Sequence, residues 1–183
     1  MTLLAIETSC DETGVAVVRN GRLLANLVSS QTSLHAEYGG VVPELATREH
    51  LRNLPVLIQA ALRDAGTDPS ALDALAATQG PGLPNALMVG LKAAQGIACA
   101  LQQPFLGIHH HEAHLYSAWV KGDPPHADFP AIQPHVALIV SGGHTLLIHV
   151  PEGLRHRVLG STLDDAAGEC FDRCDVAYIV GLE

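Results

Sequence analysis

Short apolar runs separated by polar turns occupy the first thirty residues of the chain. Residues 3–6 are apolar, residues 7–14 form a polar turn, and residues 15–18 resume as a second apolar run. The pair Asn20-Gly21 is typical of a tight hairpin, and residues 22–29 follow as a third run. The pattern predicts three antiparallel strands.

Helical spacing of apolar positions begins near residue 43 and stops at Gly66. Pro55, inside this segment, is expected to kink or split the helix. The remaining periodicity up to residue 120 predicts a strand, a helix, a strand and a helix. These four elements are expected at residues 74–78, 85–101, 105–108 and 110–120. The first 120 residues are therefore predicted to form a βββαβαβα lobe that ends in a histidine-rich helix.

A second copy of the same order follows a segment rich in Pro and Asp. Residues 121–135 are predicted to be a linker, after which strands are expected at 136–140, 145–150 and 155–162. A helix is expected to begin at Asp164, whose side chain is a candidate N-cap. Residues 136–183 thus repeat the first four elements of the chain, which indicates a duplicated α/β fold whose second lobe is incomplete.

Composition narrows the class of protein. Hydrophobic residues make up 48% and charged residues 16% of the 183 residues, which excludes a disordered chain. The net charge of -9 provides no general attraction for a polyanion, and 4% aromatic residues argue against a stacking-based nucleic-acid reader. Four irregularly spaced cysteines and the absence of a signal peptide predict a reduced, cytoplasmic protein. No apolar run is long enough for a membrane span.

Two turns of the duplicated pattern are candidate phosphate sites, because each offers backbone N–H groups between strands one and two. Either turn alone would be taken as an ordinary hairpin, which is the better explanation of an isolated Gly-Gly pair, but their equivalent placement favours a nucleotide. The candidate contacts are Asp11, Glu12 and Thr13 in the first turn, and Ser141, Gly142, Gly143 and His144 in the second.

The histidine-rich stretch of residues 109–114 is the strongest metal candidate. On a helix, His110 and His114 share one face and can bind one metal ion, whereas Glu112 lies off that face. The alternative is a polar helix with solvated histidines, and a metal would need a third ligand from elsewhere. Six further histidines are expected to be surface or packing residues: His35, His50, His126, His135, His149 and His156.

Two of three further features have two possible interpretations each, and the third is assigned to packing. The turn at residues 79–84 either binds an anion at the start of the next helix or only shapes the connection. Asp172 either accepts hydrogen bonds from a ribose or is solvated. Cys170 and Cys174 share a helix face without further zinc ligands, so we expect them to pack.

Six segments in order over residues 3–173 resemble the TsaD family, the tRNA N6-adenosine threonylcarbamoyltransferases once described as glycoproteases. They are Ala5-Ile6-Glu7-Thr8-Ser9-Cys10-Asp11-Glu12-Thr13, Gly40-Val41-Val42-Pro43-Glu44-Leu45-Ala46, Gly80-Pro81-Gly82-Leu83-Pro84, His110-His111-Glu112-Ala113-His114, Val140-Ser141-Gly142-Gly143-His144-Thr145 and Asp164-Asp165-Ala166-Ala167-Gly168-Glu169. A protease is disfavoured, because the zinc-protease pattern His-Glu-x-x-His is not met here.

The resemblance implies an actin-like ATPase fold (ASKHA, RNase H-like) and transfer of threonylcarbamoyl from threonylcarbamoyl-adenylate to N6 of adenosine 37 in tRNAs that read ANN codons. It implies that His110 and His114 bind one Fe2+ or Zn2+ ion per subunit, which acts as a Lewis acid. It places the adenylate phosphate at Ile139, Val140, Ser141, Gly142 and Gly143, and the ribose at Asp172.

The resemblance also implies tRNA as a partner, together with a TsaB-like paralogue and TsaE- and TsaC-type proteins of the same pathway. Members of the family are nearly twice as long, and Cys174-Asp175 is an insertion relative to their pattern. We therefore expect a truncated member. The alternative is a non-catalytic module that binds TsaB, or the product of a decayed gene.

Overall fold

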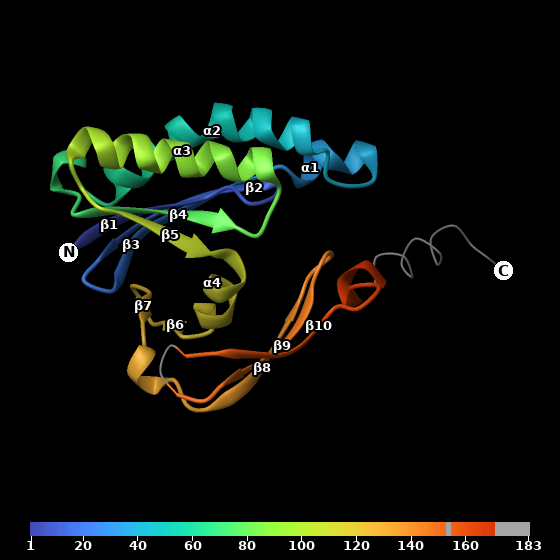
Figure 1. The fold of residues 1–183 in the computed structure, drawn as a ribbon. Helices are drawn as coiled ribbons and strands as arrows, with labels where there is room; N and C mark the ends of the chain where they lie inside the picture. Colours follow the sequence, from blue (N-terminus) through green and yellow to red (C-terminus); the bar gives the residue numbers. More distant parts are fainter. Residues whose placement is uncertain (153–154, 171–183) are drawn as a thin grey trace. The chain divides into compact units, whose positions relative to one another are not determined.

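The computed structural model describes residues 1–152 and 155–170, which fall into two compact units (Figure 1). Unit 1 comprises Met1–Ala113 and Val120–Ala127, and unit 2 comprises His114–Trp119 and the chain from Asp128 onward. The boundary therefore lies within the histidine-rich helix.

The sheet of unit 1 begins with β1 (Thr2–Glu7), β2 (Glu12–Arg19) and β3 (Arg22–Ser30), which pair antiparallel. β4 (Ala74–Gly80) lies parallel to β1, and β5 (Phe105–His109) lies parallel to β4. The order across the sheet is β5-β4-β1-β2-β3-β7-β6. The five strands predicted for the first lobe are confirmed.

Burial along these strands explains why they form. On β1 and β2, alternate side chains such as Leu4, Ile6 and Val15 are buried, as expected for strands with one face on the core. All of residues 74–78 in β4 are buried, which fits its central position between β5 and β1. The turn between β2 and β3 uses positive φ angles at Asn20 (50°) and Gly21 (78°), the geometry that favours this pair in hairpins.

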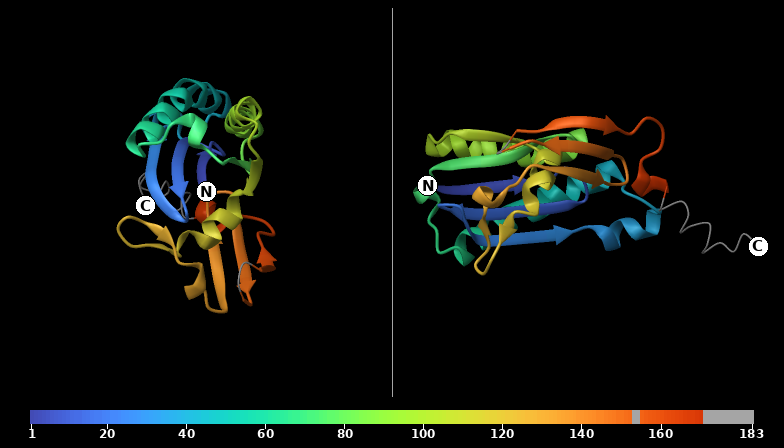
Figure 2. Two further views of the ribbon diagram at one scale, coloured as in Figure 1. Left: turned by 90° about the vertical axis from the view of Figure 1, so that its left-hand side faces the viewer. Right: turned by 90° about the horizontal axis from the view of Figure 1, so that it is seen from below.

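Two long helices, α2 (Pro43–Asp64) and α3 (Pro84–Leu101), lie side by side over one face of this sheet (Figure 2). The core between helices and sheet contains Leu4, Val17, Leu54, Leu75 and Ala94. The other predicted helix of this region, α4 (His110–Ser117), is also confirmed.

Of the kink or split predicted at Pro55, the split is wrong, because α2 continues through this residue. The missing proline N–H would otherwise bond to the carbonyl of Leu51. Both residues lie on the exposed side of α2, where water can satisfy that carbonyl.

The predicted linker at 121–135 has structure of its own. The short strands β6 (Val120–Lys121) and β7 (His126–Ala127) extend the sheet beyond β3, with Arg22 opposite His126. The N–H of Leu23 donates to the carbonyl of Pro125 at 2.8 Å, so the chain is held against the edge of β3. Shorter helices complete the connections: α1 (Thr32–His35) and the 3-10 helices η1 (Ala36–Tyr38), η2 (Pro69–Ala71) and η3 (Phe129–Ala131).

Unit 2 contains an antiparallel sheet in the order β10-β9-β8, formed by β8 (His135–Val140), β9 (Thr145–Val150) and β10 (Arg157–Ser161). Its three strands confirm the prediction. Their core is a cluster of Leu115, Ile132, Ile148 and Val150.

The helix predicted to begin at Asp164 begins later. Asp164 lies in an exposed bend, and helical residues start at Ala167. The hydroxyl of Thr145 accepts a hydrogen bond from the Ala167 N–H at 2.8 Å, so the capping oxygen comes from β9 rather than from Asp164. In the described ranges 1–152 and 155–170, no helix is both long and apolar enough to cross a bilayer.

Candidate functional site

The candidate site of unit 1 lies where three neighbouring strands end. β1, β4 and β5 are parallel, and they end at Glu7, Gly80 and His109. The segments that follow these strands therefore leave the same edge of the sheet. In open α/β sheets, this edge is where ligands bind.

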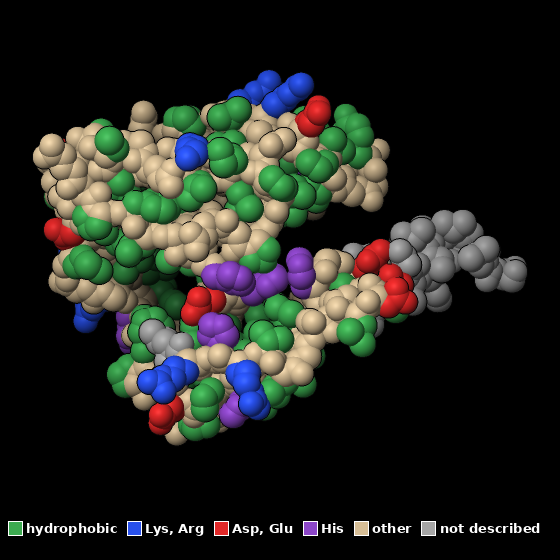
Figure 3. All heavy atoms as spheres, viewed as in Figure 1, with side chains coloured by type: hydrophobic (Ala, Val, Ile, Leu, Met, Phe, Trp, Pro, Cys, Tyr) green, Lys and Arg blue, Asp and Glu red, His purple; other side chains and the backbone are tan. Residues whose placement is uncertain are grey.

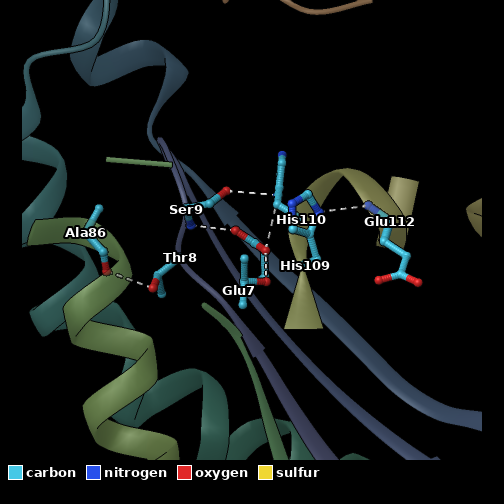
Figure 4. A network of polar contacts seen from close by, with 8 residues as sticks. Glu7, Thr8, Ser9, Ala86, His109, His110 and Glu112 are labelled. Carbon is cyan, nitrogen blue, oxygen red and sulfur yellow. Dashed lines mark hydrogen bonds and ion pairs between the residues drawn. The ribbon is translucent and has the colours of Figure 1, made fainter. Parts of the chain in front are cut away.

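Glu7 is the centre of a polar network at this edge (Figure 4). Its Oε1 accepts from the backbone N–H of Ser9 at 2.5 Å, and its Oε2 accepts from the hydroxyl of Thr78. Nδ1 of His110 lies 3.5 Å from the same Oε2 and 3.2 Å from Oγ of Ser9. One carboxylate thus connects β1, β4 and the first residue of α4.

The network determines the ionisation of Glu7. Burial raises the pKa of this carboxyl, but hydrogen bonds from His110, Ser9 and Thr78 together outweigh it and lower the pKa to about 2. Glu7 is therefore a carboxylate at every pH at which the protein is expected to work, and it presents a negative charge to His110.

The start of α4 is stabilised by the histidine that directly precedes it. Nδ1 of His109 accepts from the N–H of Glu112 at 3.4 Å, which makes His109 the cap of the helix. Figure 3 shows histidine side chains at the surface where β5 passes into α4. Because α4 is continuous, His110 and His114 occupy positions one turn apart on one helix face, as the sequence predicted.

His110 and His114 of α4 are the metal ligands predicted from the sequence. Since Nδ1 of His110 faces Glu7 and Ser9, a metal bond of this residue would have to come from Nε2. Within the part of the chain that the structure describes, no group of three or more His, Cys, Asp or Glu side chains is arranged to hold a metal ion. The two histidines of α4 are by themselves too few for a closed metal site.

The turn between β1 and β2 carries three of the candidate phosphate contacts. Asp11 is half-buried and Glu12 is exposed, so both can reach a ligand. Thr13 is fully buried, and its Oγ1 lies 2.8 Å from Nδ1 of His50. The Thr13 side chain thus anchors the turn from inside, and a contact of this residue with a phosphate stays a prediction.

The second candidate turn lies in unit 2. It closes through a hydrogen bond from the N–H of Ser141 to the carbonyl of His144 at 2.8 Å, and residues 140–144 are exposed. Ile139 is half-buried and packs against the cluster around Ile148. A Cβ on Gly168 would lie 2.4 Å from the carbonyl oxygen of Ser141, so the helix beginning at Ala167 approaches this turn closely. Asp172, the candidate ribose contact, lies outside the described residues.

The connection from β4 to α3 packs directly on the β1 end. A Cβ on Gly82 would lie 2.5 Å from the carbonyl oxygen of Ser9, which also accepts from the N–H of Leu83 at 2.7 Å. The glycine is therefore required for packing. Of the two interpretations of residues 79–84, the geometry favours shaping of the connection.

Three residues of this site were not expected from the sequence: Glu7, Ser9 and His50. An acidic residue at the end of a buried strand was the available signal for Glu7. His35 and His50 were expected at the surface or in simple packing, but both are buried and hydrogen-bonded. Nothing in the local spacing shows that His50 meets a turn 37 residues away.

Cys10 has an unusual environment for an exposed thiol. Partial burial raises its pKa to about 11, with further contributions from a hydrogen bond to Asp11 and from the charges of Asp11 and Glu7. At pH 8 we expect about a hundredfold less thiolate, and a correspondingly slower reaction with iodoacetamide, than for an ordinary thiol. The rate should rise about tenfold per pH unit until the pH approaches 11.

Peptide mass spectrometry over a pH series measures this rate, and Asp11→Asn should increase it at pH 8. A rate that levels off near pH 9 would contradict the assigned environment of Cys10.

Comparisons of sequence identify related proteins. A family model described as tRNA N6-adenosine threonylcarbamoyltransferase matches residues 22–182. Curated proteins of this name from Thermus thermophilus and Prosthecochloris aestuarii are 53% and 50% identical, and each match covers 100% of this chain. The two matches cover 53% and 52% of the relatives' own lengths, so the chain spans about half of their length.

Comparisons of structure address the fold. YeaZ from Pseudomonas aeruginosa superposes with a TM-score of 0.58 at 24% identity, over 88% of this chain and 66% of that one. Component A of Acidaminococcus fermentans (R)-2-hydroxyglutaryl-CoA dehydratase superposes with a TM-score of 0.52 at 16% identity, over 100% of this chain and 55% of that one. These are actin-like folds, so the predicted fold class is confirmed.

Proposed function

Because the chain belongs to the tRNA N6-adenosine threonylcarbamoyltransferase family, we propose that the protein at its native length is a threonylcarbamoyl transferase. It would transfer the threonylcarbamoyl group from threonylcarbamoyl-adenylate to N6 of adenosine 37 in tRNAs that read ANN codons. The observation that carries the proposal is the polar set at the carboxyl edge of β1, β4 and β5, where Glu7, Ser9 and His110 meet. The adenylate carbonyl carbon would gain a bond to N6 and lose its bond to the phosphate oxygen, which releases AMP and a proton.

His110 and His114 are the proposed ligands of one Fe2+ or Zn2+ ion. When bound, the metal would supply a Lewis acid that polarises the carbamoyl oxygen. Glu7 supports this assignment, because a carboxylate on one nitrogen of an imidazole orients the ring and leaves the other nitrogen to face a metal. Glu7 and Ser9 would therefore keep the His110 ring in a single orientation.

Nucleotide contacts are proposed in each unit by itself. In unit 1, Asp11 and Glu12 present carboxylates that can accept hydrogen bonds from sugar hydroxyls. In unit 2, the exposed backbone of residues 140–143 and the side chain of His144 can donate to a phosphate. Asp172 stays a proposed ribose contact on the resemblance alone.

Partners and location are further proposals. We infer tRNA as the acceptor substrate and a TsaB-like paralogue as a protein partner. An apolar groove between α2 and α3, with Leu51, Met88 and Val89 in its lining, supports a protein partner on unit 1. TsaE- and TsaC-type proteins and a cytoplasmic setting are proposed from the family alone.

The proposal can be tested by measuring the modification of tRNA in the cells that make this protein. Deletion of the gene should abolish the threonylcarbamoyl modification of adenosine, measured by mass spectrometry of tRNA nucleosides, and the unaltered gene should restore it. His110→Ala and His114→Ala should restore less than about a tenth, because each removes a metal ligand. His126→Ala, an exposed histidine of β7, is the matched control and should restore the full level.

Full modification in the deleted strain would reject the proposed function. Full modification in both α4 variants, at normal protein levels, would reject the metal ligands alone.

A further inference from the structure

Three buried polar side chains lie beneath the turn that connects β1 to β2. The exposed fractions of His50, Gln31 and His35 are 0%, 3% and 4%. Burial of such groups is costly unless each one has a hydrogen-bond partner. Here each of the three side chains has hydrogen-bond partners, and together these bonds form a continuous network from α1 and α2 to the turn.

Backbone groups determine the direction of every hydrogen bond in the first part of this chain. The N–H of Val42 lies 3.3 Å from Nδ1 of His35, so that nitrogen accepts. Nε2 of a neutral His35 therefore donates to Oε1 of Gln31 at 3.1 Å. The amide nitrogen of Gln31 then donates to the carbonyl of Ala46 at 3.3 Å.

The same argument applies to His50 on α2. Its Nε2 lies 2.9 Å from the carbonyl oxygen of Cys10, which can only accept, so Nε2 carries the proton. Nδ1 of the neutral ring accepts from the hydroxyl of Thr13 at 2.8 Å. One imidazole thus holds the two residues that flank Asp11 and Glu12 in the turn.

Gln31 adds a third attachment. Its backbone N–H donates to the carbonyl of Asp11 at 3.0 Å, and its side-chain nitrogen lies 3.4 Å from Nδ1 of His50. His50 and Gln31 therefore hold the turn through the backbone carbonyls of Cys10 and Asp11, and His50 also holds it through the side chain of Thr13.

We propose that His50 is a positioning residue for nucleotide binding. It touches no ligand, because it is fully buried. It holds the turn in the conformation in which the Asp11 and Glu12 side chains meet the adenylate. This inference rests on the proposed function, which supplies the nucleotide.

The test measures binding of AMP, the nucleotide that the transfer would release, by calorimetry on the protein at its native length. His50→Leu removes both hydrogen bonds and should weaken AMP binding about tenfold. His50→Gln retains an amide donor for the Cys10 carbonyl and should lose less. Thr13→Val removes the other partner, and the double variant His50→Leu with Thr13→Val should lose little more than His50→Leu alone.

Leu62→Ala is the control for a purely structural effect, because Leu62 is a buried α2 residue that belongs to the hydrophobic core cluster. It should lower thermal stability without changing AMP affinity. Hydrogen exchange gives a second readout: in His50→Leu the amides of residues 10–13 should exchange at least about tenfold faster, while those of β4 are unchanged.

Unchanged AMP affinity in His50→Leu, or an equal loss in Leu62→Ala, would overturn the inference. So would an unaltered protein that does not bind AMP. An unaltered protein that binds AMP but whose deletion leaves tRNA modification intact would instead count against the proposed function.

Discussion

Replacement of Gly90 by valine is expected to lower the free energy of unfolding of unit 1 by about 3 kcal/mol. Gly90 is buried on the face of α3 that packs against β1, and a Cβ there would lie 2.5 Å from Oγ1 of Thr8 and 3.0 Å from Cγ2 of Ile6. The Thr8 hydroxyl also donates to the carbonyl of Ala86 at 2.8 Å and accepts from the Gly90 N–H at 3.1 Å. The branched side chain would therefore separate α3 from β1.

The measurement is thermal and urea unfolding of the full chain by circular dichroism, where a midpoint lowered by about 10 °C is expected. Gly96→Ala is the control in the same helix, because no atom lies within 4 Å of the added Cβ. It should raise the free energy of unfolding by about 0.5 to 1 kcal/mol, since alanine favours a helix more than glycine does. Equal effects of the two substitutions would contradict the close approach of α3 to β1.

Replacement of Glu7 by alanine is expected to reduce tRNA modification by about ten- to a hundredfold. Without this carboxylate, His110 loses the group that orients its ring, although the proposed metal ligand itself remains. The buried hydroxyl of Thr78 and the N–H of Ser9 also lose their acceptor, which should cost about 2 kcal/mol of folding free energy. The two effects can be measured separately as kcat/KM at native length and as the unfolding midpoint.

The substitution Glu7→Gln separates the contribution of the negative charge of Glu7 from that of its hydrogen bonds. The amide oxygen can still accept from Ser9, so much of the lost stability should return, whereas activity should stay low because the negative charge beside His110 is absent. Glu44→Gln, at an exposed acidic position in the first turn of α2, should change neither quantity. Normal activity of Glu7→Gln and Glu7→Ala would show that Glu7 does not orient His110.

The local sequence pattern was sufficient to predict an element wherever that element depends only on residues close to it in the chain. The alternating residues of β1 and β2, the Asn20-Gly21 turn and the apolar faces of α2 and α3 all follow from spacings of two to four residues. The split expected at Pro55 and the helix start expected at Asp164 were wrong, because surroundings outside the local pattern decided both outcomes. The Leu51 carbonyl that lacks a partner N–H at Pro55 belongs to an exposed residue, where water can reach it. The hydroxyl of Thr145 supplies the cap that was expected from Asp164.

The sequence by itself determined the five main strands of unit 1, the helices α2, α3 and α4, the three strands of unit 2 and the family, because these depend on residue identity and short-range periodicity. It also placed His110 and His114 on one helix face, since the pitch of a helix is the same in every protein. Only the tertiary structure brought Glu7 to His110 and His50 to the turn at Thr13. Those contacts join residues 103 and 37 positions apart, and they exist because parallel β1 and β5 end at one edge and α2 packs beneath the turn. A hydrogen bond depends on such distances in space, which no local pattern contains.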